Sequence, residues 1–252
     1  MNNTLNIIHE DNDIIVCHKP AGMATEGATV GKMDLVSNIR NYLARKNRAA
    51  GKTGKPPYVG TLYRLDQPVE GVVVVAKNKA AATFIAKQIK EHTTDKYYYA
   101  LCYGNVTDDA GHLEDLLVRK QNDGLALVVS RKEANSLKNQ TIILGKGQEQ
   151  RIFSGEIKKA VLDYEVMQRD ENSSLLKIKL QTGRFHQIRV QLAHMGHPIL
   201  GDRKYGTKES LEYSERFGKT NVCLACYRFG FVHPSSKKKV FFEITIPQSL
   251  KL

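Results

Sequence analysis

The chain has 252 residues, 41% of them hydrophobic, and its 38 Lys and Arg against 26 Asp and Glu give a formal net charge of +12. This length and composition favour one large folded domain, or two lobes that share a groove, and argue against general disorder. Because residues 1–13 are polar and no run approaches the roughly 18 apolar residues that span a bilayer, we expect a cytoplasmic protein without a membrane partner.

The charge favours a partner that carries phosphates, although a basic soluble protein without such a partner remains an alternative. The four cysteines do not suggest a disulfide framework in a cytosolic setting. Cys223 and Cys226 form a C-x-x-C pair. No second pair follows, and residues 222–232 are typical of a strand, so we interpret these cysteines as packing thiols rather than a zinc or redox motif.

The first elements lie between residues 14 and 55. Residues 14–16 predict a strand that ends in the turn Lys19-Pro20-Ala21-Gly22. Asp34 is placed to cap a helix. Its apolar positions recur at helical spacing: Leu35, Ile39, Tyr42 and Leu43. A basic loop is expected next, where Arg45, Lys46, Arg48, Lys52 and Lys55 would meet a polyanion, with a solvated linker as the alternative.

The middle of the chain alternates strands and a helix. Residues 71–76 contain four consecutive valines and predict a buried central strand. Apolar positions between Ala81 and Ile89 predict a helix, and residues 97–103 predict another strand. Residues 108–156 lose clear periodicity, so we expect peripheral hairpins and loops there.

The C-terminal part is predicted to be rich in strands. Residues 175–180 alternate apolar and basic side chains as a strand does. A helical pattern follows with Phe185, Ile188, Leu192 and Met195, and stops at Gly196. Strands at 229–232 and 240–246 frame a polar turn and predict a closing hairpin. No repeat or linker marks a boundary, so residues 1–252 are expected to form a single domain with two lobes about one cleft.

Charged groups stand directly before the valine strand, in residues 63–71. Asp66 there can act as a nucleophile or a base, and Arg64 can bind a phosphate or enter a base stack. Loops anchored on rigid strands commonly carry catalytic groups. A turn closed by a surface ion pair is the alternative.

A second polar cluster occupies residues 182–189, at a strand-to-helix junction. Arg184 at a helix start opposes the helix dipole and needs an anionic partner, for which Asp66 is a candidate. His186 suggests acid–base chemistry, but we favour a hydrogen-bonded structural residue.

These residues resemble the RluA-type branch of RNA pseudouridine synthases. Residues 63–77 are similar to the family motif His-Arg-Leu-Asp, variable residues, Gly, an apolar run and Ala-Lys. The other matching segments follow in family order: Lys19-Pro20-Ala21-Gly22, Lys96-x-Tyr98-x-Ala100 with Gly104, 183–189, 196–202, Tyr205-Gly206, His233-Pro234 and Ile246-Pro247. Together they cover most of residues 14–247.

The resemblance implies an α+β pseudouridine synthase fold, with a mixed, largely antiparallel sheet split by a cleft and flanked by helices and loops. Asp66 would be the catalytic aspartate, and Tyr98 would stack on the target base and help move a proton. Arg184 would pair with Asp66, and an opposing guanidinium favours the ionised carboxylate. Arg64 would fill the space left by the flipped nucleotide. The family needs no cofactor.

The resemblance also implies a structured RNA as partner, ribosomal or transfer RNA, bound by a monomer. The RNA-contacting residues that we predict are Arg64, Lys96, Arg189, Arg45, Lys46 and Arg48. The S4-like RNA-binding domain that often precedes this catalytic domain is absent from the matched pattern. Tyr63 replaces the usual family His, Phe185 the common Thr, and Ala225 stands where many members have His, which puts substrate choice in doubt.

Two rival hypotheses stay open on the sequence alone. A catalytically silent RNA-binding protein could keep the same cleft, although Asp66, Tyr98 and Arg184 are retained. A hydrolytic glycosidase would need a second carboxylic acid, for which Glu70 is the nearest candidate. The basic charge fits a polyanion better than a neutral sugar. The reaction breaks a C–N glycosidic bond and forms a C–C bond, so Asp66 could add to the base or to the sugar, or remove a sugar proton.

Overall fold

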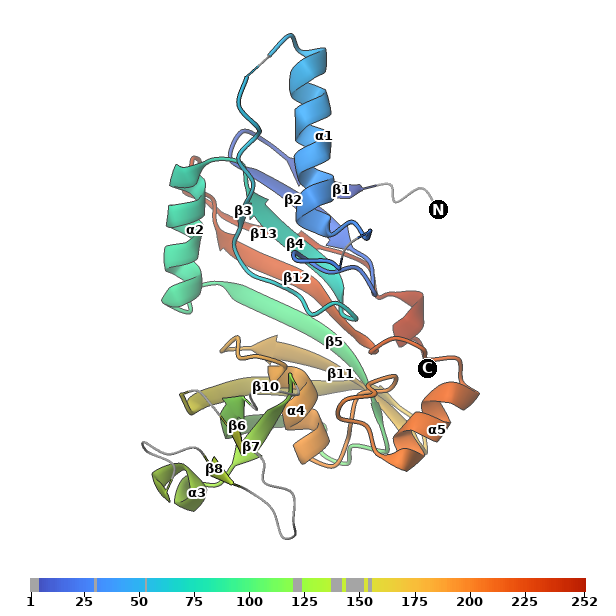
Figure 1. Ribbon diagram of the computed structural model, residues 1–252. Helices are drawn as coiled ribbons and strands as arrows, with labels where there is room; N and C mark the ends of the chain where they lie inside the picture. Colours follow the sequence, from blue (N-terminus) through green and yellow to red (C-terminus); the bar gives the residue numbers. More distant parts are fainter. Residues whose placement is uncertain are drawn as a thin grey trace. The chain divides into compact units, whose positions relative to one another are not determined.

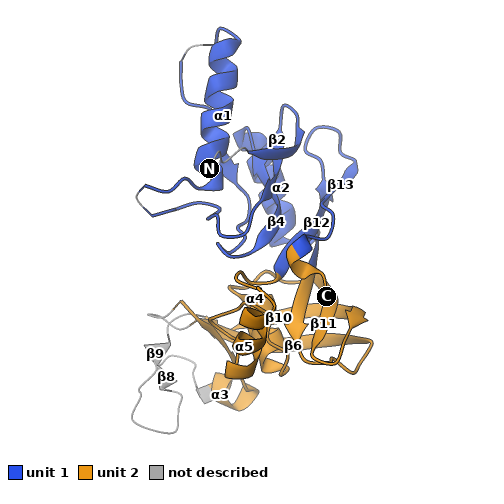
Figure 2. Cartoon of the chain, turned by 90° about the vertical axis from the view of Figure 1, so that its right-hand side faces the viewer, with its two compact units in different colours: residues 1–98, 224–248 blue, residues 99–223, 249–252 orange. Residues whose placement is uncertain are grey.

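A computed structural model describes residues 5–29, 31–52, 54–119, 124–136, 142–143, 152–153 and 156–252. The chain divides into two compact units (Figure 2). Unit 1 comprises Met1–Tyr98 and Leu224–Gln248, and unit 2 comprises Tyr99–Cys223 and Ser249–Leu252. The chain crosses the boundary within β5 (Asp95–Tyr103). The expected single domain over residues 1–252 stays a prediction.

The sheet of unit 1 is built around β4 (Glu70–Ala76). Its neighbours run in the order β1 (Asn6–Glu10), β2 (Ile14–Lys19), β4 and β12 (Leu224–Val232), with β3 (Gly60–Thr61) also on β4 and β13 (Lys239–Glu243) on β12. The β4–β12 pair is parallel and the other described pairs of this unit are antiparallel. The four valines of β4 are fully buried, which confirms the predicted central strand.

Unit 1 also contains two helices with capped N-termini (Figure 1). Helix α1 (Leu35–Ala49) begins at Asp34, whose side chain accepts the Ser37 N–H at 2.7 Å, as predicted. Helix α2 (Lys79–Lys90) is capped by Asn78, and its Ile85 joins the core formed by β2, β4 and β12.

The prediction placed the start of the basic loop too early in the chain. Arg45, Lys46 and Arg48 lie in the last turns of α1, which continues to Ala49, and Gly51 with φ of 71° ends it. Cations near a helix C-terminus are stabilised by the helix dipole, which explains why a charged run stays helical here.

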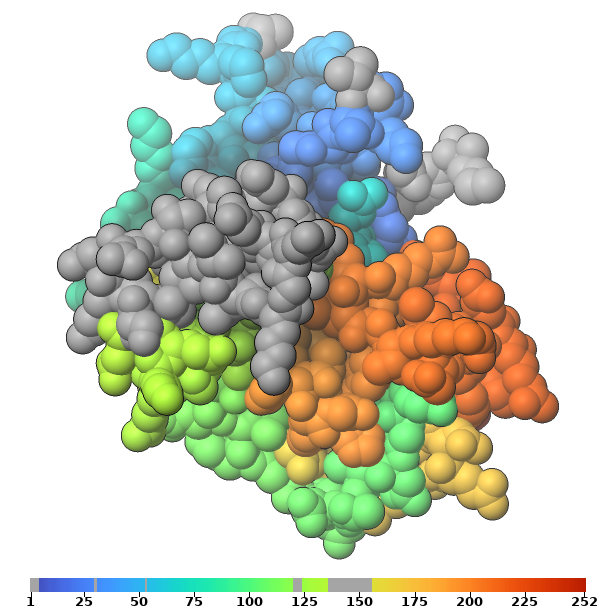
Figure 3. Space-filling model, turned by 60° about the horizontal axis from the view of Figure 1, so that its bottom comes forward, coloured from blue at the N-terminus to red at the C-terminus, as the bar shows by residue number. Residues whose placement is uncertain are grey.

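Unit 2 holds an antiparallel arrangement in the order β11 (Ser173–Leu180), β10 (Lys158–Arg169), β6 (Ala110–Arg119) and β7 (Ala126–Val129). Helix α4 (Gln187–His194) packs against β6 and β7. Helix α5 (Lys208–Arg216), orange in Figure 3, keeps only Ser210 and Ser214 buried. The smaller elements are α3 (Arg131–Ser136), the β8–β9 pair (Ile142–Ile143 and Ile152–Phe153) and η1 (Gln248–Leu250).

Two further expectations need correction. Within residues 108–156, β6 and β7 pair antiparallel at the edge of the sheet, in keeping with the expected peripheral hairpins. The correction concerns β6, which is also an integral strand because residues 110–117 pair with β10. Part of the range 108–156 lies outside the described residues. The helix predicted from Phe185 starts only at Gln187, and Phe185 is exposed. The closing hairpin is confirmed, since β12 and β13 pair with Phe229 opposite Phe242. The mixed, mostly antiparallel sheet matches the predicted fold class.

Candidate active site

Asp66 lies in the loop between β3 and β4 of unit 1 and is half-buried. Its carbonyl accepts the Val69 N–H at 3.0 Å and closes a turn. On one side of it, Leu65 exchanges two hydrogen bonds with the hydroxyl of Thr25, at 2.8 and 3.2 Å. On the other side, the Gln67 carbonyl accepts the Gly22 N–H at 2.9 Å. The backbone of Asp66 is therefore fixed from both sides, which limits the entropy lost in orienting its carboxylate.

Lys19 is the group that the sequence analysis left without a role. Its side chain is fully buried at the end of β2, and its ammonium donates to three backbone carbonyls, of Pro20 (3.1 Å), Met23 (2.6 Å) and Gln67 (3.2 Å). Burial lowers the pKa of Lys19 to about 8, while the negative charges of Asp66 and Glu70 oppose this shift. The lysine thus ties the Lys19-Pro20-Ala21-Gly22 turn to the Asp66 loop. The motif pointed to its position but not to this contact.

Tyr98 and Asp66 come within electrostatic reach of each other. Tyr98 on β5 is 7% exposed and hydrogen-bonds with Cys226. Burial raises the pKa of Tyr98 well above the ordinary phenol value, and Cys226, Tyr63 and Asp66 act in the same direction. The Tyr98 hydroxyl is therefore protonated at neutral pH and can donate a proton or a hydrogen bond.

Cys226, the residue that hydrogen-bonds with Tyr98, lies where β4 and β12 approach each other closely. Gly71 lies opposite Cys226 in the parallel β4–β12 pair, and a Cβ there would meet the Cys226 carbonyl oxygen at 2.3 Å. Burial raises the pKa of Cys226 to about 12, so its sulfur is a neutral thiol. Cys223 and Cys226 are both buried free thiols, consistent with packing.

Tyr63 and Lys96 are both partly buried, although Lys96 was predicted to contact RNA. Tyr63 packs on Phe229, with 4.5 Å between ring centroids, and donates its hydroxyl to the Val72 carbonyl at 3.0 Å. Lys96 is half-buried, with its ammonium 5.9 Å from the Tyr63 ring centroid, and burial lowers its pKa. The tyrosine that replaces the family histidine is thus a core residue of unit 1.

Arg64 is the exposed cation beside Asp66. Its side chain is 70% exposed, and it pairs with Glu26 at 3.3 Å. This is the surface ion pair that the alternative reading of the turn predicted. Such exposed pairs contribute about 0–1 kcal/mol, so the guanidinium is easily transferred to another anion.

In unit 2, Arg184 lies at the junction of β11 and α4 and is half-buried. Its Nε donates to the Lys159 carbonyl at 2.9 Å, and its backbone N–H donates to the Gln187 side chain at 3.0 Å. The buried Gln187 also binds Thr182 and so shapes the turn. Arg184 and Asp66 belong to different units, and the expected ion pair between them stays a prediction.

His186 adopts the structural role that we favoured. It is buried, has φ of 53°, and its Nδ1 lies 2.8 Å from the Tyr205 hydroxyl. Phe185 stacks on its ring, with 3.8 Å between centroids, and the Arg119 guanidinium lies 4.5 Å from the Phe185 centroid. The departure at Phe185 therefore creates an exposed aromatic–cation stack beside Arg184.

Arg189 does not suit the RNA contact that we predicted for it. Its side chain is 4% exposed, and Nε and one terminal nitrogen bind both oxygens of the fully buried Asp202 at 2.7 and 2.8 Å. A guanidinium held bidentately in the interior cannot reach a phosphate without breaking this pair. We therefore correct its assignment to a structural residue of unit 2.

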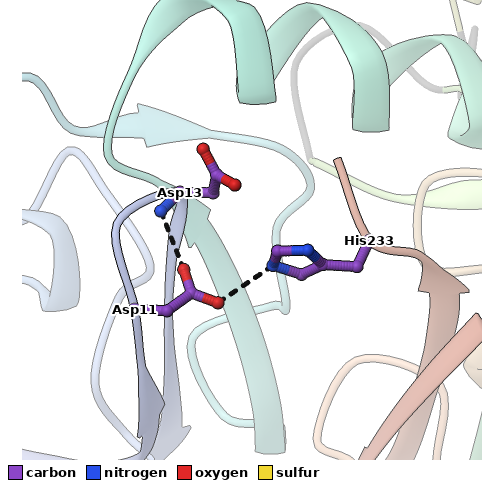
Figure 4. A group of neighbouring side chains, drawn as sticks. All are labelled: Asp11, Asp13 and His233. Atoms are coloured by element: carbon purple, nitrogen blue, oxygen red, sulfur yellow. Dashed lines mark hydrogen bonds and ion pairs between the residues drawn. The ribbon is translucent and has the colours of Figure 1, made fainter. Parts of the chain in front are cut away.

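Asp11, Asp13 and His233 gather at the turn between β1 and β2 (Figure 4). They are the one group in the described part of the chain whose ligand-type atoms, within 4.8 Å of one another, have metal-site spacing. Asp11 already accepts the N–H groups of Asp13 and Ile14, at 2.7 and 2.8 Å, and contacts His233 at 2.9 Å. These hydrogen bonds hold the β1–β2 hairpin in place, and this structural role explains why the three residues lie together.

In the described residues, no helix is both long and apolar enough to cross a membrane.

Solved structures define the class of fold. The human RNA pseudouridylate synthase domain containing 1 protein aligns with 96% of this chain and 83% of its own, at a TM-score of 0.70 and 20% identity. The human domain containing 4 protein aligns with 96% of this chain and 89% of its own, also at 0.70, with 21% identity. The chain thus has the pseudouridine synthase fold.

The family follows from sequence comparison. The model of the RNA pseudouridylate synthase family matches residues 13–194. A relative from Aquifex aeolicus, described as an uncharacterized RNA pseudouridine synthase, is 34% identical over 98% of this chain and 71% of its own. The ribosomal large subunit pseudouridine synthase D of Zymomonas mobilis is 30% identical over the same shares. The chain belongs to the RNA pseudouridylate synthase family and is an RNA pseudouridine synthase, which excludes the glycosidase hypothesis.

Proposed function

We propose that this enzyme isomerises uridine in ribosomal RNA of the large subunit, with Asp66 as its catalytic carboxylate. The substrate class is suggested by relatives named for the large ribosomal subunit, among them the synthase D of Zymomonas mobilis and the synthase C of Vibrio cholerae, which is 27% identical over 96% of this chain and 65% of its own. The observation that carries the Asp66 assignment is the double clamp on its backbone, within electrostatic reach of Tyr98.

In the proposed reaction, the bond between C1′ and N1 breaks, the base turns, and C1′ bonds to C5. The hydrogen of C5 then leaves as a proton to solvent, and N1 takes up a proton, so the product is an isomer of uridine. Asp66 supplies the carboxylate, by adding to the base or the sugar or by removing a sugar proton. Tyr98 stays neutral because its pKa is raised by burial, so it supports the base and passes a proton as a hydroxyl rather than as a phenolate. Arg184 holds the Asp66 charge.

Binding of the RNA is assigned to exposed cations. Arg64 is the one next to Asp66, and we propose that it exchanges Glu26 for the RNA when the target nucleotide is extruded. Arg45 and Arg48 are exposed on α1, and Lys46 lies beside them with its ammonium on Glu10. Lys96 stays a candidate close to Tyr63. The protein is proposed to act as a monomer without a cofactor, in the cytoplasm.

The test is tritium release from RNA labelled at C5 of uridine, with wild-type protein and the variants Asp66→Ala and Asp66→Asn. Unmodified large-subunit ribosomal RNA and transfer RNA transcripts serve as separate substrates. We expect release from the ribosomal transcript by the wild type only, with RNA affinity of both variants within about twofold of wild type, because the carboxylate acts on bonds rather than on phosphates.

Each alternative outcome has a distinct meaning. Release by Asp66→Asn would overturn the carboxylate assignment. Release from transfer RNA alone would overturn the substrate class but leave Asp66 in place. Binding of both transcripts without release by the wild type would contradict turnover and favour the silent RNA-binding hypothesis.

A further inference from the structure

A polar cavity lies wholly within unit 1, next to α1. It encloses about 610 Å³, a size typical of small-molecule sites. Its charge and its aromatic surface come from five lining residues: Glu10, Lys46, Lys52, Tyr58 and Lys77. They come from the end of β1, the last turns of α1, the segment before β3, and the residue after β4.

This cavity lies at the opposite end of β4 from the candidate catalytic loop. Lys77 follows the last residue of β4, whereas Asp66 precedes its first residue, Glu70. A strand of seven residues rises by about 3.3 Å per residue, so the two positions are separated by roughly 20 Å. The cavity is therefore distinct from the position where Asp66 would act.

Tyr58 supplies an aromatic platform at the cavity wall. Its side chain is 39% exposed, and a Cβ on Gly60 would lie 2.8 Å from two of its atoms. The Tyr58 ring therefore rests directly on the Gly60 backbone, which is paired with Ala76 of β4. A ring fixed in this way can accept a flat ligand without losing much conformational freedom.

Three lysines supply the positive charge, and the carboxylates of Glu10 and Asp11 in the same lining offset part of it. Lys46 and Lys77 bind the two oxygens of Glu10, at 2.9 and 2.7 Å, and Glu10 is nearly buried. Burial would raise the pKa of Glu10, but the hydrogen bonds from Lys77, Lys46 and Tyr42 lower it to about 2. The carboxylate thus anchors two ammonium groups, and Lys46 remains 56% exposed. The side chain of Lys52 is exposed, and its backbone is held by its N–H, which donates to the Asn47 carbonyl at 2.9 Å.

A fixed aromatic face next to exposed ammonium groups is the combination that holds an unpaired nucleotide. The base would stack on the ring and the phosphate would pair with lysine. Asn12 and Asn47 also line the cavity, and their amides are of the kind that donate to and accept from base edges. An acidic peptide would use the lysines but not the platform. The net charge of +12 favours a polynucleotide over a free nucleotide.

We propose that this cavity binds one unpaired nucleotide of the substrate RNA, away from the modified uridine, with its base on Tyr58 and its phosphate at Lys46 and Lys52. The proposal rests on the proposed RNA substrate. The cavity would thus position a part of the RNA that lies outside the catalytic position.

The experiment measures the affinity of the full chain for a 12-nucleotide oligouridylate, an RNA duplex of equal length, and uridine monophosphate, by fluorescence anisotropy with competition. We expect Tyr58→Ala to weaken binding of the oligouridylate about tenfold and to leave duplex binding unchanged, because a paired base cannot reach the ring. Tyr58→Phe should bind as the wild type does. Phe217→Ala, which removes a 52% exposed aromatic ring in unit 2, is the matched control and should have no effect.

Lys52→Gln provides a second variant that leaves the fold intact, since Lys52 is exposed, and should weaken oligouridylate binding by several-fold. Equal losses for single strand and duplex in Tyr58→Ala, or no loss in both variants, would overturn the proposal. So would uridine monophosphate binding as tightly as the oligonucleotide, which would indicate a mononucleotide site, or competition by poly-glutamate that is sensitive to Tyr58→Ala.

Tritium release is measured in parallel with the same proteins. Tyr58-dependent binding in a protein that releases no tritium would support the cavity and contradict the proposed reaction. Tritium release with Tyr58-independent binding would do the reverse, so failure of the two proposals can be told apart.

Discussion

Lys19 and Arg189 are both cations removed from water, and their neighbours give them different properties. Arg189 faces a carboxylate bidentately, so its charge is compensated. Lys19 donates to three neutral carbonyls, and the charges of Asp66 and Glu70 only partly offset the cost of burial, which lowers its pKa to about 8. At the scale of single residues, the identity of the partner therefore decides whether a buried charge is stable or strained.

The first prediction concerns Lys19 and pH. The native lysine releases its proton near pH 8 and the unfolded one near 10.5, so between these values the unfolded state binds more protons. The stability of the wild type relative to Lys19→Met should therefore rise with pH across this window, by on the order of 3 kcal/mol. Urea unfolding from pH 7.5 to 10.5 measures it. Lys87→Met, at a 72% exposed position, should give a flat difference, and a flat difference for Lys19→Met would contradict the buried charge.

Arg189→Met tests the corrected role of that residue. Removing one partner leaves the Asp202 carboxylate buried without its charge partner, so we expect a loss of about 3–5 kcal/mol in the free energy of unfolding. The double variant Arg189→Met with Asp202→Leu should recover part of that loss. If Arg189→Met instead kept its stability and lost RNA affinity, the original assignment as an RNA contact would be correct.

Elements in this protein are bounded by features that sequence patterns only partly reveal. Helix α1 extends through Arg45 and Arg48 because the dipole favours cations in its last turns, although apolar spacing ends near Leu43. Strand β6 alternates exposed side chains with partly buried ones and carries His112 and Glu114 on its exposed face, so it lacks the long apolar run that identified β4. Pairing with β10, rather than local composition, makes it a strand.

Gly71 gives a prediction at the level of two packed strands. Gly71→Ala would place a Cβ 2.3 Å from the Cys226 carbonyl at φ of 137°, so β4 and β12 must separate. We expect a loss of roughly 2–6 kcal/mol from strain and overpacking, measured by urea unfolding. Gly51→Ala is the control, because its φ is also positive at 71° but no atom lies within 4 Å of its Cβ, and it should lose only about 1–2 kcal/mol. Equal losses would show that backbone strain alone, not the strand contact, requires the glycine.

For the whole molecule, the charge of +12 indicates affinity for polyanions but does not say where they bind. The exposed side chains of Arg45 and Arg48 on α1 are the cations that we expect to meet phosphates first. They are not among the residues that line the proposed nucleotide cavity, and helical spacing places them on the opposite face of α1. That outer face is therefore a separate candidate part of the RNA surface.

The salt dependence of RNA binding tests that expectation. Replacing both arginines with glutamine should reduce the slope of log affinity against log salt for a single strand by about 1.4, since each phosphate contact contributes about 0.7. The control Lys87→Gln with Lys208→Gln removes two exposed cations from α2 and α5, and should change the slope much less. The same change in both double variants would mean that net charge, not α1, controls binding.

Patterns along the chain predicted most of the local elements and the family. Local patterns, namely four valines in a row and a capping Asp34, predict the central strand and the start of the first helix. The ordered motifs around Asp66 indicate the family through their resemblance to it. Three features required contacts between distant segments: Arg189 is an interior partner of Asp202, Lys19 ties two loops together, and Tyr58 rests on Gly60 at the wall of a cavity. Burial and partner choice arise from strand pairing and packing between distant segments, and residue spacing along the chain does not encode them.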